Sequence, residues 1–260
     1  MVLAALSRLA RIRVTLGYTA LLAAVATVLF LLGPHVRDKV IRLASTNLHN
    51  LSDGRIGTLL GSAFVTEPGP VYIWLPGLVA LLSLAELIWR SGRLVVAFLV
   101  GHVGATLLVA AGLAAALGAG FLSHSVRYLS DVGMSYGAVA VLGTLTPAIP
   151  VRLRGAWIGW WLAVAVGAAV FSGGDFTNIG HAVALVLGMG VGTRFGRPSR
   201  WTPGRYFLLV VAAVFCYLIF VGTDPVIVPT MGLGVLAAVL ASRITRRRLV
   251  NRTLALAAGP

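Results

Sequence analysis

Charged residues are scarce in this chain, and acidic residues are the scarcest. Charged side chains make up 11% of the 260 residues, with 7 Asp and Glu against 21 Lys and Arg, whereas an ordinary soluble domain carries about 25% charged residues. The single cysteine, Cys216, excludes an internal disulfide and a cysteine-rich metal site. The sequence also lacks a phosphate-binding glycine loop and a histidine cluster. We therefore expect no cofactor and no bound metal.

Apolar residues dominate instead. They make up 58% of the chain, and the mean hydropathy is +0.95. Runs of about 18 or more apolar residues are long enough to cross a bilayer as helices. The sequence therefore predicts an all-α polytopic protein of the cell membrane, with eight spans at residues 14–33, 71–89, 94–118, 133–150, 155–172, 177–193, 206–222 and 225–242.

The basic residues predict the orientation of these spans, because cytoplasmic loops retain Lys and Arg. With both chain ends inside, sixteen of the 21 basic residues fall on the inner side and five on the outer side. Because the charge follows topology, we expect no nucleic-acid partner. The cluster from Arg243 to Arg252 is instead expected to meet anionic lipid head groups.

Two polar residues stand near the outer ends of apolar spans. Ser135 lies in the sequence Gly-Met-Ser-Tyr-Gly at the start of the fourth span, and His181 lies near the start of the sixth. Both spans enter from the outer face, so at about 1.5 Å rise per residue the two side chains should differ in depth by only a few Å. Small residues on the His181 face, Ala184 and Gly188, permit close approach of the helices.

Such a pair suits nucleophilic catalysis. A serine hydroxyl becomes a strong nucleophile when a neutral imidazole takes its proton, which predicts Ser135 as the nucleophile and His181 as the general base and then the general acid. The backbone N–H of Ser135, at a helix N-terminus, is a candidate donor to the oxyanion. Serine alone or histidine alone is more often a structural residue of a membrane bundle.

Local motifs resemble the rhomboid family of intramembrane serine proteases. The family has a G-x-S-G motif opening its fourth core span and a histidine in its sixth. The matching segments are Gly133-Met134-Ser135 with Gly143, His181 with Ala184 and Gly188, Glu86 with Arg90-Ser91-Gly92-Arg93, and Ser62-Ala63-Phe64.

The resemblance implies a rhomboid-like six-helix core with two further transmembrane helices at its carboxyl side. It divides the chain into a basic cytoplasmic amino terminus (1–13), the core (14–195), the two added helices (196–242) and a basic cytoplasmic tail (243–260). It also implies cleavage of a membrane-anchored protein substrate near the outer face of the membrane.

The sequence departs from the family at four positions. Pro70 and Trp74 occupy the usual places of a histidine and an oxyanion-binding asparagine. Tyr136 replaces the glycine after the nucleophile, and Val139 replaces an aromatic residue that often stacks on the histidine. Asn178, one turn before the histidine, is a candidate substitute donor to the oxyanion.

Two functions remain open on these grounds. One is an intramembrane serine protease that uses Ser135 and His181. The other is a catalytically inactive relative that binds or escorts transmembrane helices. A transporter would require paired broken helices and midplane charges, which the sequence lacks. His102, in the middle of the third span, is favoured as a structural hydrogen-bonding residue over a proton-handling one.

Overall fold

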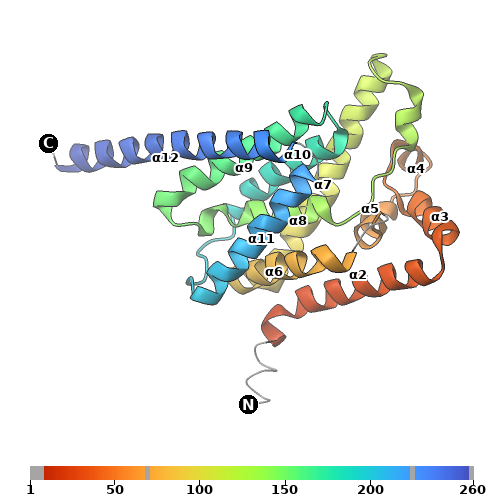
Figure 1. The fold of residues 1–260 in the computed structure, drawn as a ribbon, viewed down its shortest axis with the longest axis horizontal. Helices are drawn as coiled ribbons and strands as arrows, with labels where there is room; N and C mark the ends of the chain where they lie inside the picture. The colour runs from red at the N-terminus through yellow and green to blue at the C-terminus, as the bar shows by residue number, and fades with distance from the viewer. Residues whose placement is uncertain (1–8, 68–70, 223–225, 258–260) are drawn as a thin grey trace.

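The computed structural model describes residues 9–67, 71–222 and 226–257, and within these ranges the regular structure is entirely helical. After a short 3₁₀ turn (Ala10–Ile12), the long helices are α2 (Arg13–Leu31), α6 (Val71–Trp89), α7 (Ser91–Gly118), α9 (Val151–Phe171), α11 (Pro203–Val221) and α12 (Ile227–Ala257). These six are long and apolar enough to cross a membrane. Two shorter helices, α8 (Ser135–Thr144) and α10 (Phe176–Gly192), complete the bundle (Figure 1).

Helix α8 forms the centre of the bundle (Figure 1). All its residues from Tyr136 to Thr144 are buried, and it packs against α10, α7, α6 and α11. The predicted span at 133–150 is therefore longer than the helix that forms, which has 10 residues and is followed by a 3₁₀ turn at Thr146–Ala148. At 1.5 Å per residue α8 is about 15 Å long, half the thickness of a hydrocarbon core of about 30 Å.

The last helix is longer than the sequence predicts. The sequence predicts a span ending at residue 242, but α12 continues to Ala257 through the basic segment and has 31 residues. Figure 1 shows it reaching well beyond the rest of the bundle, alongside α9 over its first half. The absence of a side chain at Gly159 allows α9 and α12 to pack this closely. A Cβ on Gly159 would lie only 2.7 Å from the carbonyl oxygen of Ala237 and would push the helices apart.

The loop between α2 and α6 carries its own short helices, α3 (Pro34–Ala44), α4 (Leu48–Ser52) and α5 (Thr58–Gly61), and a 3₁₀ turn at Ser62–Phe64. Two of these helices begin at residues that favour a helix start. Helix α3 has proline at its first position, and Asn47 is the N-cap of α4, where its side chain accepts a hydrogen bond from the Asn50 N–H at 2.9 Å. The loop packs against α2 and α7.

Glu86 joins α2 to α6 and α7. Its buried carboxylate accepts hydrogen bonds from the backbone N–H groups of Val14 and Thr15, from the Thr15 hydroxyl at 2.7 Å and from the Ser91 hydroxyl at 2.6 Å. A buried carboxylate is tolerated when its oxygens are fully hydrogen-bonded. This residue therefore holds the first helix against the central part of the bundle.

Candidate functional site

Ser135 is the first residue of α8. The chain reaches it through Gly133, whose φ of +119° is one that L side chains rarely adopt. The Gly133 N–H donates to the Ser62 carbonyl oxygen at 2.9 Å, which fixes this turn against the loop between α2 and α6. Ser135 is half-buried and lines a cavity of about 730 Å³.

The cavity lies between the amino-terminal part of α6 and the carboxyl-terminal part of α11. Its walls include Trp74 and Gly77 of α6, Phe215 and Leu218 of α11, and its polar lining includes Ser135 and Thr177 of α10. Trp74, predicted from the family pattern to occupy an asparagine position, therefore faces the same space as Ser135. Pro70, the other departure, lies outside the described residues.

His181 lies in the second turn of α10, 4% exposed. Its Nδ1 is 3.5 Å from Oδ1 of Asn178, one turn earlier on the same helix, while its Nε2 has no hydrogen-bond partner within the described part of the chain. When Nδ1–H donates to Asn178, Nε2 carries the free lone pair that a general base needs. Asn178, predicted as a candidate oxyanion donor, thus contacts the imidazole.

Ser135 and His181 come from two closely packed helices. A Cβ on Gly188 would lie 2.0 Å from the Ala140 carbonyl oxygen, and one on Gly143 would lie 2.5 Å from the Leu185 carbonyl oxygen. Only glycine fits at both positions. No hydrogen bond joins Ser135 to His181, since Nδ1 contacts Asn178 and Nε2 has no partner among the described residues.

The residue after Ser135 contacts the imidazole instead. Tyr136 packs edge-on against the His181 ring, with centroids 5.3 Å apart and planes at 80°. Phe220 of α11 makes a similar contact at 5.7 Å. An aromatic neighbour for the histidine is therefore present, although Val139 stands where the family often has one. The sequence could not show this, because it depends on the rotation of α8.

A second serine and histidine are hydrogen-bonded elsewhere in the bundle. Ser62 Oγ lies 3.1 Å from Nε2 of His102, and the Thr46 hydroxyl contacts Ser62 Oγ at 3.0 Å. Ser62 is 1% and His102 3% exposed, and neither lines the cavity that contains Ser135. Their hydrogen bond joins the loop between α2 and α6 to α7.

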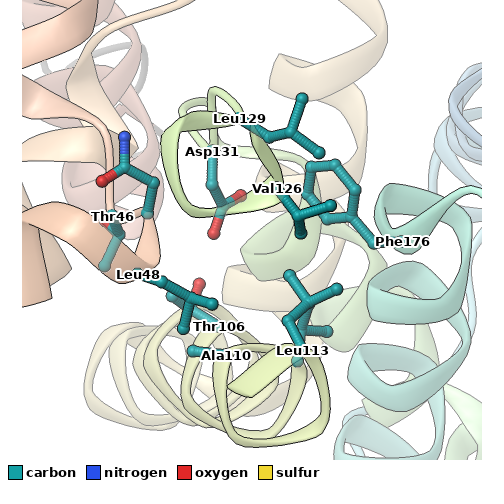
Figure 2. A pocket seen from close by; sticks show the side chains of 11 residues that line it. Thr46, Leu48, Thr106, Ala110, Leu113, Val126, Leu129, Asp131 and Phe176 are labelled. Carbon is teal, nitrogen blue, oxygen red and sulfur yellow. The ribbon is translucent and has the colours of Figure 1, made fainter. Parts of the chain in front are cut away.

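The same loop holds the segment that leads into α8. The Thr46 N–H donates to the Asp131 carbonyl oxygen at 2.9 Å, and the Asp131 N–H donates to Ser45 Oγ at 2.8 Å. Figure 2 shows the Asp131 carboxylate pointing into a small pocket beside Thr106 of α7. Burial, together with the nearby charge of Glu67, raises the pKa of Asp131 to about 6.

A family model described as rhomboid-like protein matches residues 10–195. The chain belongs to the rhomboid-like protein family. With its six long apolar helices, this rhomboid-like protein is a multi-pass membrane protein. Helices α11 and α12 lie beyond the matched residues. Comparisons with curated proteins and with solved structures found no match.

Proposed function

We propose that this rhomboid-like protein is an intramembrane serine protease that cleaves membrane-anchored proteins near the outer face of the membrane, with Ser135 as nucleophile and His181 as base. The observation that supports the proposal is that a cavity-lining serine and a buried imidazole, whose Nε2 has no partner among the described residues, lie on two helices in direct backbone contact. An unpartnered imidazole nitrogen in an apolar interior carries a desolvation cost of about 1–3 kcal/mol, so its retention favours a chemical role.

The chemistry follows from this arrangement. Nε2 of His181 accepts the Ser135 proton as the hydroxyl oxygen attacks the peptide carbonyl, and later returns a proton to the leaving amine. Asn178 keeps the proton on Nδ1 and so keeps Nε2 free. Catalytic hydrogen bonds are often long or poorly aligned before substrate binds, so the proposal requires Ser135 and His181 to come into contact when substrate is bound.

The cavity suits a peptide substrate. Its apolar walls on α6 and α11 fit a segment leaving the hydrocarbon region, and its polar end lies at Ser135 and Thr177. The first turn of α8 adds N–H groups and the positive end of the helix dipole where an acyl oxyanion would form. Anionic lipid head groups near the basic carboxyl-terminal part of α12 are a further proposed contact.

The apolar lining of the same cavity also supports a second function, in which the protein binds a transmembrane segment without cleaving it. In that inactive relative, Ser135 would be unreactive, because no hydrogen bond activates it in the described structure. The two functions differ in whether the serine reacts as a nucleophile.

The test is covalent labelling by a fluorophosphonate in bilayer nanodiscs, followed by mass spectrometry of the labelled peptide. We expect labelling at Ser135 that is lost in both Ser135→Ala and His181→Ala. Ser83→Ala is the matched control, because Ser83 is a buried serine of α6 whose hydroxyl also has no partner. A folded protein that does not react, or that reacts equally after His181→Ala, would contradict the proposal and favour the binding function.

A further inference from the structure

Arginines gather at the end of the bundle where α9 and α11 both begin. Arg152 and Arg154 lie in the first turn of α9, and Arg200 and Arg205 flank the start of α11. Among the described residues none of these four arginines forms an ion pair. The positive dipole ends of both helices add to their charge. This end, which the distribution of basic residues predicts to be cytoplasmic, is therefore strongly positive.

A groove of about 310 Å³ opens at the same end of the bundle. Its walls are apolar and aromatic and come from three helices: Leu153, Ala156 and Trp160 of α9, Tyr206 and Leu209 of α11, and Ala238 of α12. In a bilayer, apolar space on the surface of a helix bundle is filled by lipid chains, which are as apolar as a leucine side chain. The groove therefore suits an acyl chain.

The aromatic residues of the groove turn their ring faces, not their polar atoms, toward this space. The Trp201 N–H donates to the Ala148 carbonyl oxygen at 2.8 Å, and the Trp157 N–H donates to Thr146 Oγ1 at 3.2 Å. Tyr206 stacks on Trp201, with ring centroids 4.9 Å apart. Tryptophan and tyrosine are typical of the level at which lipid chains meet their head groups. The groove therefore opens near the head groups.

Two arginines lie where the groove reaches that level. Arg152 is exposed and precedes Ala156 by one helical turn, so it lies on the groove-lining face of α9. Side chains of a helix lean toward its amino terminus, which here is the charged end of the bundle. The Arg154 guanidinium is also beside the groove, because its Nη2 donates at 3.2 Å to the carbonyl oxygen of Ile149, a lining residue. Guanidinium groups suit phosphate oxygens.

We infer that this groove binds an anionic phospholipid of the cytoplasmic leaflet, with an acyl chain against Trp160 and Tyr206 and the head group at Arg152 and Arg154. The site is separate from the basic carboxyl-terminal part of α12 and does not depend on the reactivity of Ser135. Basic pockets between transmembrane helices on the cytoplasmic side are typical sites for anionic lipids. A second apolar groove, formed by Ile227–Val239 of α12 alone, has no arginine and no aromatic ring in its lining. Lipid chains there should show no head-group preference.

The test is quenching of tryptophan fluorescence in the full chain in phosphatidylcholine nanodiscs, because Trp157, Trp160 and Trp201 line the groove and brominated acyl chains quench the indole rings that they contact. Dibrominated phosphatidylglycerol is compared with dibrominated phosphatidylcholine. Each arginine near an anionic head group should contribute about fivefold in affinity. We therefore expect phosphatidylglycerol to reach half of its quenching at a mole fraction about 25-fold lower than phosphatidylcholine.

Three variants assign this preference to the groove. Arg152→Gln should reduce it about fivefold. Arg93→Gln is the matched control and should not change it, because the Arg93 guanidinium lies 5.9 Å from the centre of the Phe195 ring, which does not line the groove. Ala156→Phe fills the groove and retains the charges, so the preference should disappear while the melting temperature is unchanged.

Three results would overturn the inference. The first is equal quenching of wild type by the two lipids. The second is a preference that Arg93→Gln lowers as much as Arg152→Gln, which would indicate surface charge without a site. The third is a preference that persists in Ala156→Phe, since the acyl chain would then lie elsewhere.

Discussion

Gly188 sets the distance between the helices that carry Ser135 and His181. In Gly188→Ala, the new Cβ would lie 2.0 Å from the carbonyl oxygen of Ala140 and 2.7 Å from its carbonyl carbon. Ordinary contact between such atoms begins near about 3.5 Å. Because the opposing atoms are backbone, no side-chain rotation relieves the overlap. Helices α8 and α10 must separate locally by about 1 Å or more.

This separation has two measurable consequences. Overpacking a well-packed interior costs about 1–3 kcal/mol, so the free energy of unfolding should fall by that amount. A displacement of about 1 Å between reacting groups can cost about 10²-fold in rate, so fluorophosphonate labelling at Ser135 should slow by a comparable factor. Unfolding is measured in detergent micelles and labelling in nanodiscs.

Gly190→Ala is the control for removing a glycine from the same helix. A Cβ at Gly190 meets nothing within 4 Å, so this change should be neutral or stabilise the helix by up to about 1 kcal/mol. If Gly188→Ala proves as stable and as reactive as Gly190→Ala, the close contact between α8 and α10 is not what holds the site together, and the argument from glycine spacing fails.

Three further changes test other parts of the structure. Glu86→Gln removes charged acceptors that tie α2 to α6 and α7, and it should lower the free energy of unfolding by about 2–4 kcal/mol, read from thermal unfolding. The raised pKa of Asp131, about 6 against 3.8, means that wild type loses stability as pH rises from about 4 to about 6. Asp131→Asn should abolish that loss and be more stable by about 3 kcal/mol at pH 7, with no difference below pH 4. Ser62→Ala leaves Nε2 of His102 without its partner and should cost about 1–3 kcal/mol while labelling at Ser135 stays unchanged. A label that maps to Ser62 in wild type and is lost in Ser62→Ala would instead identify this pair as the reactive one.

Long apolar runs made much of the fold predictable. The span predicted at 71–89 coincides with α6 (Val71–Trp89), because an apolar run bounded by turn residues has few alternatives to a helix. The run at 133–150 forms a helix of only 10 residues, α8, followed by a 3₁₀ turn. Hydropathy does not distinguish a segment that faces lipid from one that faces protein. Helix α8 is buried from Tyr136 to Thr144, so its apolar composition does not require the length of a bilayer-spanning helix. The division of the chain into a core and added segments, and the orientation of the spans, stay predictions.

The sequence predicts which residues belong to the candidate site, but it does not predict which of their side chains are in contact. Ser135 and His181 followed from short motifs, and glycine spacing indicated close helix packing. Which side chain meets the imidazole depends on the rotation of α8 about its axis, and no local pattern encodes that rotation. The pairing of Ser62 with His102 likewise joins residues 40 positions apart in the chain. No motif around either residue signals that contact.

The candidate site is not confined to the family core. The matched region ends at residue 195, yet α11 forms one wall of the cavity that contains Ser135, and Phe220 of α11 packs against the His181 ring. Gly77 of α6 accommodates this helix, because a Cβ there would lie 2.5 Å from Cβ of Phe215. A side chain at position 77 would force α11 outward and widen the cavity. The helix beyond the core therefore determines the size and apolar character of the space in which Ser135 would meet a substrate.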